Sequence, residues 1–86
     1  MKSIKILGKE YKIEQVTGKE LGGSYGDCDT SHGYIRINSG ITTAQKEDTL
    51  IHEVIHIISD ELQLELTERQ VTLLATALYA QGVRIK

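Results

Sequence analysis

The residues best suited to chemistry are two histidines and a glutamate within five positions, His52-Glu53-Val54-Ile55-His56. On a helix, residues four apart lie on one face with their Cβ atoms about 5–6 Å apart. Both imidazoles can therefore bind one zinc ion at Zn–N distances of about 2.0–2.1 Å. Glu53 lies about 100° around the helix, too far to bind the ion but close enough to take a proton from a zinc-activated water. We predict a zinc site with His52 and His56 as ligands and Glu53 as the general base.

The alternative interpretation of this motif needs no metal. His52 and His56 would then be partly exposed helix residues, and Glu53 would lie on a solvated face. Two of the three histidines in the chain fall inside the motif, which this interpretation treats as coincidence. We therefore favour the metal site.

A catalytic zinc site needs a third protein ligand and one open position, and the spacing leaves the third ligand open. Glu68 can return toward His56 if the two helices pack together, although the helix dipole alone also favours an acid in a first turn. Asp60 lies four residues past His56, but three ligands along one straight helix diverge from a common point. His32 is the third alternative.

Cys28 and His32 offer a different arrangement. Cys28-x-x-x-His32 together with His52-x-x-x-His56 provides four ligands, enough for a closed structural zinc site without an open position. The protein would then be a non-catalytic, zinc-stabilised interaction module. A nucleophilic Cys–His pair is the weaker alternative, because no feature of the sequence marks the Cys28 thiol as activated.

The histidine motif must lie on a helix, and the second half of the sequence predicts two helices. Residues 42–45 form a capping box, after which apolar residues recur at helical spacing over 50–62. A short link at 63–66 precedes a second capping box at 67–70, and Gly82 stands where a residue just beyond a helix end would stand. So short a link predicts that the helices pack as a hairpin.

The first half of the sequence predicts strands. Two short alternating runs, Ile4–Ile6 and Tyr11–Ile13, flank Gly8-Lys9 and indicate a hairpin, and a third run covers Gly33–Asn38. Four of the eight glycines fall within Gly18–Gly26, which predicts a loop or a bulged edge. We expect an α+β fold in which a small antiparallel sheet of three to four strands packs on the helix hairpin.

Composition limits the remaining function classes. The 86 residues carry 10 Lys+Arg and 12 Asp+Glu, a net charge of −2, which lacks the basic stripe of a nucleic-acid-binding protein. At this length we expect one domain spanning residues 1–86. One cysteine excludes an intramolecular disulfide, and the sequence has neither a signal-peptide pattern nor an apolar run of membrane length. These features favour a cytoplasmic protein with no membrane partner.

The run Asp48–His56 resembles the active-site helix of the small zincin-type metallopeptidases of phage and bacterial genomes, which are loosely grouped with the ImmA/IrrE-like proteins. Residues 25–29 and 34–37 look like the strand pair that precedes that helix, and residues 66–71 look like the start of the family's second helix. The similarity covers about residues 24–80, although only the five-residue motif is sharp.

The resemblance implies a zincin-like core, Zn²⁺ as cofactor and a peptide or protein as substrate, with a regulatory protein as a further partner. It implies His52 and His56 as zinc ligands, Glu53 as general base, and an acidic third ligand on the second helix, the role that Glu68 matches best.

By analogy with larger zincins, the strand at 34–37 serves as the edge along which an extended substrate lies, with Tyr34 and Arg36 as substrate-binding residues. The residue that stabilises the oxyanion stays open among Tyr25, His32, Tyr34, Arg36 and Tyr79.

Overall fold

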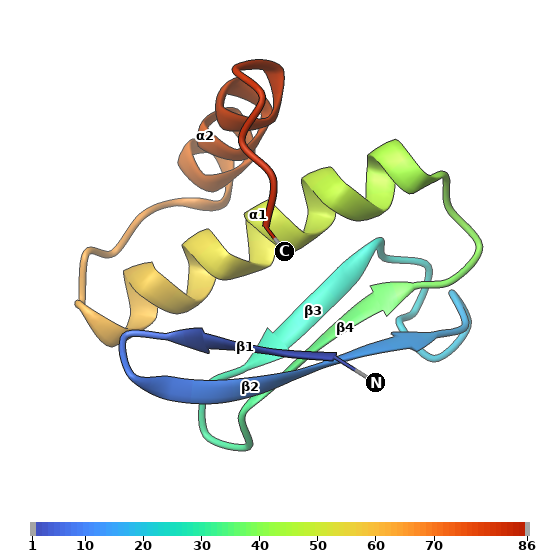
Figure 1. The fold of residues 1–86 in the computed structure, drawn as a ribbon, viewed down its shortest axis with the longest axis horizontal. Helices are drawn as coiled ribbons and strands as arrows, with labels where there is room; N and C mark the ends of the chain where they lie inside the picture. Colours follow the sequence, from blue (N-terminus) through green and yellow to red (C-terminus); the bar gives the residue numbers. More distant parts are fainter. Residues whose placement is uncertain (1, 86) are drawn as a thin grey trace.

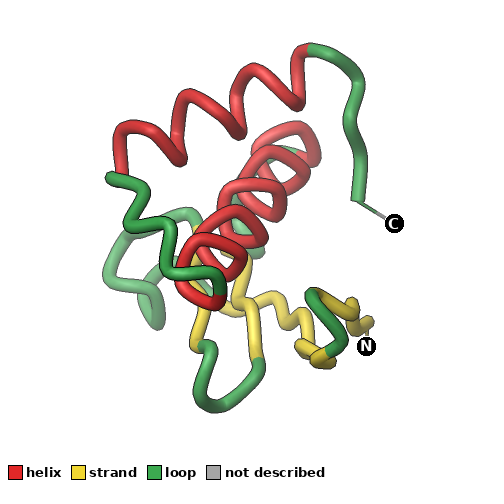
Figure 2. Tube along the Cα trace, turned by 90° about the vertical axis from the view of Figure 1, so that its left-hand side faces the viewer, coloured by secondary structure: helices red, strands yellow, loops and turns green. Residues whose placement is uncertain are grey.

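The computed structural model describes residues 2–85, which form a four-stranded sheet followed by two packed helices. In chain order these elements are β1 (Lys2–Ile6), β2 (Lys9–Val16), β3 (Gly26–Asp29), β4 (Tyr34–Asn38), α1 (Thr43–Glu61) and α2 (Glu68–Ala80). Helix α1 crosses one face of the sheet, and α2 lies on the far side of α1 (Figure 1). In the view turned by 90°, the sheet, α1 and α2 form three successive layers (Figure 2). The predicted α+β class and helix pair are confirmed.

The sheet has the strand order β1-β2-β4-β3 and is mixed. The outer pairs β1–β2 and β3–β4 are antiparallel, but β2 and β4 are parallel, so the expectation of an antiparallel sheet is wrong at the centre. The reason is the path of the chain: after β2 it crosses to form β3 as an outer strand, and the next hairpin returns β4 between the two. The predicted first hairpin is confirmed, with Leu7 and Gly8 between β1 and β2.

Both predicted capping boxes are present. In α1, the Thr42 hydroxyl accepts the Gln45 backbone N–H at 3.1 Å, and the Gln45 side chain accepts the Thr42 N–H at 2.9 Å. Thr67 and Gln70 repeat both bonds at the start of α2, at the same distances. At the other end of α2, Gly82 has φ of 93° and occupies the predicted position just beyond the helix.

The link between the helices is tied back onto the last turn of α1. The Gln63 N–H donates to the Asp60 carbonyl at 3.2 Å, and the Leu64 N–H donates to the Ser59 carbonyl at 2.9 Å. This is the Schellman pattern, here with Gln63 in the left-handed conformation at φ of 54°. The buried Ser59 hydroxyl also accepts the Leu66 N–H at 3.0 Å. These bonds fix the point at which α2 begins.

The core lies between the sheet and α1 and consists of Ile6, Tyr11, Ile35, Ile37 and Ile57. Helix α2 packs on α1 and buries only Val71 and Ala75. Leu74 and Leu78 belong to the same predicted apolar face, but they are 45% and 38% exposed because α1 is the only helix or strand within residues 2–85 that packs on α2.

No helix within residues 2–85 has the length and apolar character needed to cross a membrane.

Candidate metal centre

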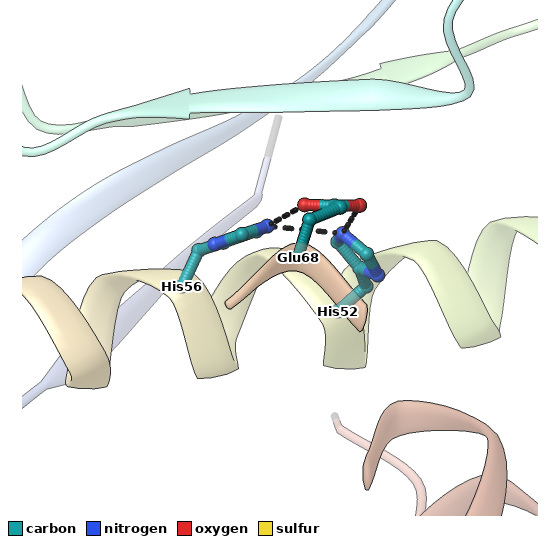
Figure 3. Close-up of side chains that lie close together, drawn as sticks. All are labelled: His52, His56 and Glu68. Atoms are coloured by element: carbon teal, nitrogen blue, oxygen red, sulfur yellow. Dashed lines mark hydrogen bonds and ion pairs between the residues drawn. The ribbon is translucent and has the colours of Figure 1, made fainter. Parts of the chain in front are cut away.

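Three side chains from two helices converge on one point. The Nε2 atoms of His52 and His56 lie 3.1 Å apart. One oxygen of Glu68 lies 2.8 Å from the His56 Nε2, and the other lies 3.1 Å from the His52 Nε2. Figure 3 shows the carboxylate bridging the two rings on the side of α1 that faces β3. The predicted pairing of the two histidines with Glu68 is therefore present.

These separations fit a bound metal ion. A tetrahedral ion with bonds of about 2.0–2.1 Å holds its ligand atoms about 3.3 Å apart. The two nitrogens, 3.1 Å apart, come within a few tenths of an ångström of that value, and each lies 2.8 or 3.1 Å from a different oxygen of Glu68. Two imidazole nitrogens and a carboxylate oxygen are also donors that zinc commonly takes. The group could hold a metal ion with a small outward movement of its side chains.

The two helices hold their ligands differently. His52 and His56 are one turn apart in the middle of α1, with side chains 20% and 31% exposed. Glu68 is the first residue of α2 and its side chain is 70% exposed. Its position follows from the Thr67 cap and from the link, and Thr72 one turn later donates a long 3.4 Å bond to its carboxylate.

The other two alternatives for the third ligand do not join the group formed by His52, His56 and Glu68. The Asp60 carboxylate accepts the Thr30 hydroxyl at 2.8 Å. The His32 ring is 75% exposed in the β3–β4 turn and pairs with Asp29 at 3.0 Å. Within residues 2–85, one group of three potential ligands comes within 4.8 Å, and it contains neither Cys28 nor His32. The closed four-ligand site is therefore not assembled here.

Glu53 is buried, with 5% of its surface exposed. The metal-free interpretation, which places Glu53 on a solvated face, is therefore wrong for this residue. Burial raises the pKa of Glu53 above its usual value, while the Cys28 thiol, which donates to its carboxylate, and the adjacent His52 and His56 partly offset the increase. The carboxylate lines the same groove as His52 and Glu68. Glu53 thus lies beside the three converging ligands without joining them.

Cys28 is a neighbour of Glu53 that no pattern in the sequence connects with it. Burial, followed by the nearby Glu53 carboxylate, raises the pKa of the Cys28 thiol to about 12. A thiol that stays protonated at neutral pH is a poor nucleophile, which argues against the Cys–His pair. Cys28 comes close to Glu53 because β3 packs on α1. The short β3 sequence has no periodicity from which this packing could be predicted.

The predicted edge strand is wrong. β4 pairs with β2 on one side and β3 on the other, so β3 forms the sheet edge nearest the ligands. Tyr34 and Arg36 alternate with Ile35 and Ile37, which enter the core, and so lie on the sheet face away from α1. Arg36 is bound there to Asp27 by hydrogen bonds of 2.5 and 2.9 Å. The structure does not bring these two residues to the metal centre.

A groove runs beside the ligands between α1, the start of α2 and the segment 23–26. A Cβ at Gly26 would lie 2.7 Å from the Thr49 side chain, so glycine allows β3 to approach α1 here. Among the oxyanion alternatives, Tyr25 lines this groove and its hydroxyl accepts the Gln45 amide at 3.1 Å. Tyr79 instead donates to Glu47 at 2.9 Å.

Comparison with known proteins gives no relative: no protein-family model, no curated protein and no solved structure matches this chain.

Proposed function

We propose that this protein is a zinc-dependent peptide hydrolase with a zincin-like core. The observation that carries the proposal is the convergence of the His52 and His56 nitrogens and the Glu68 carboxylate at separations of 2.8–3.1 Å. A ligand set of two histidines and one glutamate leaves a fourth tetrahedral position open, as catalytic zinc requires.

Glu53 is the general base of the proposed reaction. Bound zinc supplies a Lewis acid that lowers the pKa of water and polarises a carbonyl oxygen. Glu53 lines the groove next to His52, so its carboxylate can accept the proton of the attacking water and return it to the leaving amine. The direction of its pKa shift supports this role, because a carboxylate whose pKa moves toward neutral is a stronger base.

The peptide substrate binds in this proposal along β3. This strand ends the sheet order next to the groove, and an edge strand offers backbone N–H and C=O groups to an extended peptide. Gly26 and Cys28 of β3 line grooves on either side of the ligands, with His52 beside the first and His56 beside the second. A peptide along this edge would therefore pass the metal centre.

The test compares the wild type with Glu53→Gln, using dye-labelled unfolded casein and a random peptide mixture as substrates. We expect cleavage that EDTA abolishes and zinc restores. Glu53→Gln should keep its zinc content and lower the cleavage rate by at least about 100-fold, the usual contribution of general-base catalysis. Glu61→Gln, the same change at an exposed position on the same helix, is the matched control and should cleave like the wild type.

Two results would contradict the proposal. One is zinc-loaded wild-type protein that cleaves neither substrate. The other is a Glu53→Gln variant that cleaves at the wild-type rate, because the activity would then come from another group or from a contaminant.

A further inference from the structure

Helix α2 forms the outermost layer of the fold (Figure 1). Three of its leucines, Leu73, Leu74 and Leu78, are 54%, 45% and 38% exposed, and Ala77 is exposed as well. Residues 70–83 contain no charged side chain. A surface helix normally carries charged and polar residues on its outer face, and a contiguous exposed apolar surface marks a site of interaction. This face of α2 is therefore suited to contact another molecule.

The exposed residues of α2 form a stripe whose spacing is the same in both directions along the helix. The α2 stripe begins and ends with a glutamine, and its members follow at steps of three, one, three, one and three residues: Gln70, Leu73, Leu74, Ala77, Leu78 and Gln81. Steps of three and four residues keep these positions on one side of the helix. A stripe with this spacing matches a second copy of itself when the two helices run antiparallel.

Antiparallel pairing of two α2 stripes places unlike residues at the same level. Leu73 of one copy lies level with Leu78 of the second copy. Leu74 lies level with Ala77, so a large side chain meets a small one near the centre. Parallel pairing would instead place each residue beside itself and bring two alanines together, which packs less well. The antiparallel arrangement also brings opposite ends of the two helix dipoles together.

We propose that the α2 stripe is the interface of a symmetric dimer, in which two copies of this chain pack α2 against α2 in antiparallel orientation. Such an interface uses the same surface on both copies, so any charge near its centre would meet a like charge. Residues 70–83 satisfy this requirement because they carry no charge. The dimer is independent of the proposed function, since no member of the α2 stripe lines the groove beside the metal ligands.

The exposed area of the chain agrees with a dimer of this size. The chain exposes 5604 Å², whereas a compact monomer of 86 residues exposes about 5,100 Å². Two copies that each covered the excess of about 500 Å² would bury about 1,000 Å² in total. This is the lower limit for a specific interface, so we expect a dimer that dissociates in the micromolar range.

A membrane surface is a less suitable occupant of the α2 stripe. Helices that lie on a membrane carry several lysines and arginines on their polar face, which bind anionic lipid headgroups. Within Glu68–Ala80 the only basic residue is Arg69, and the whole chain has a net charge of −2. The composition of α2 therefore favours a protein surface of matching apolar character.

The experiment is sedimentation velocity of the full chain from about 1 to about 300 µM, in EDTA so that no metal ion joins two copies. We expect the average mass to rise from that of a monomer toward that of a dimer. Leu73→Glu should raise the dissociation constant at least tenfold, because it brings a charge into an apolar contact. Ala77→Glu keeps every leucine and should have the same effect.

Leu7→Glu is the matched control. Leu7 is 57% exposed, close to the value for Leu73, but it lies in the turn between β1 and β2. This variant should dimerise like the wild type, and circular dichroism checks that all variants keep the fold. A wild type that stays monomeric up to the highest concentration would overturn the proposal and leave the stripe to another partner. A dimer that Leu73→Glu and Ala77→Glu leave unchanged, or that Leu7→Glu weakens equally, would overturn it too.

Disulfide cross-linking tests the antiparallel orientation. In the proposed dimer Gln70 of one copy lies level with Gln81 of the second copy. Gln70→Cys and Gln81→Cys proteins, both with Cys28→Ser to remove the native thiol, are mixed and oxidised. The mixed disulfide should form at least about tenfold faster than either symmetric one, because a disulfide needs Cα atoms within about 7 Å. Faster formation of the Gln70→Cys or Gln81→Cys homodimer would overturn the antiparallel arrangement.

Discussion

Helices α1 and α2 begin with the same Thr-x-x-Gln capping box, but their surroundings differ. α1 packs against the sheet on one side and α2 on the other, and buries five of its residues, Thr49, Ile51, Glu53, Ile57 and Ser59. Among the helices and strands of residues 2–85, α2 packs on α1 alone, and it buries only Val71 and Ala75 and leaves Leu73, Leu74 and Leu78 exposed. Because tertiary packing supplies most helix stability in proteins, α2 should open locally at a lower free energy than α1.

This difference divides the candidate metal ligands into two classes. His52 and His56 lie in the middle of α1, which the core holds against the sheet. Glu68 depends on the cap and link at the start of a helix with a single neighbour. A preformed pair and a more weakly held third ligand would let the ion bind to the histidines first.

The largest expected effect is on metal affinity, and it compares one ligand from each helix. Four-ligand structural zinc sites bind with about 10–16 kcal/mol, so one ligand is worth about 10²–10³-fold in affinity. We expect His56→Ala to lose this full factor. Glu68→Gln should lose only about 10–100-fold, the range typical of supporting residues, because water can replace an exposed ligand. Competition with a chromophoric chelator measures both dissociation constants.

His32→Ala is the control for this comparison, because the His32 ring is exposed and lies outside the ligand group. It should bind zinc like the wild type. Equal losses for His56→Ala and Glu68→Gln would show that α2 holds its ligand as firmly as α1, and the comparison between the helices would fail.

Ser59→Ala tests whether the link positions α2. The Ser59 hydroxyl is buried and accepts the Leu66 N–H at 3.0 Å, so its removal leaves that donor without a partner. We expect the free energy of unfolding, from urea titration in EDTA, to fall by about 1–2 kcal/mol. Zinc affinity should fall as well, because α2 begins at Glu68, two residues after Leu66.

Ser39→Ala provides the matched control. Ser39 is exposed and its hydroxyl makes no hydrogen bond within residues 2–85. Its replacement should change stability by less than about 0.5 kcal/mol and leave zinc affinity unchanged. A Ser59→Ala protein that is destabilised but binds zinc like the wild type would show that the link stabilises the fold without positioning Glu68.

Local features of this fold could be predicted from the sequence. The capping boxes at Thr42 and Thr67 and the end of α2 at Gly82 involve residues within a few positions of one another. The spacing of His52 and His56 depends only on helix geometry. Each of these predictions is confirmed because no distant contact competes with it.

Features that depend on distant contacts could not be predicted in the same way. The run at 34–37 alternates as well in a central strand as in an edge strand, and only its pairing with both β2 and β3 decides between them. Which acid joins the histidines depends on the path of the link, which the sequence does not encode as a simple pattern. The contact between Cys28 and Glu53 joins β3 to α1 and has no local signal at all.

The smallest effect concerns the stability of α1 itself. Burial raises the pKa of Glu53 in the folded protein above its value in the unfolded chain. Above the folded pKa, wild-type protein must therefore keep a charge in a poorly solvated site, which lowers its free energy of unfolding. Glu53→Gln removes that charge, so in EDTA at pH 7 the variant should be more stable than the wild type.

The sign of the pH dependence distinguishes this explanation from a packing effect. As pH falls through the folded pKa, folded wild type takes up a proton before the unfolded chain does, and it gains stability relative to the variant. The difference should therefore shrink with acidification and vanish below the unfolded value of about 4.3. Urea unfolding at pH 4, 5, 6 and 7 measures it, with exposed Glu61→Gln as control. A variant less stable than wild type at pH 7 would mean that the Cys28 thiol and the two imidazoles outweigh desolvation, and that Glu53 stabilises α1.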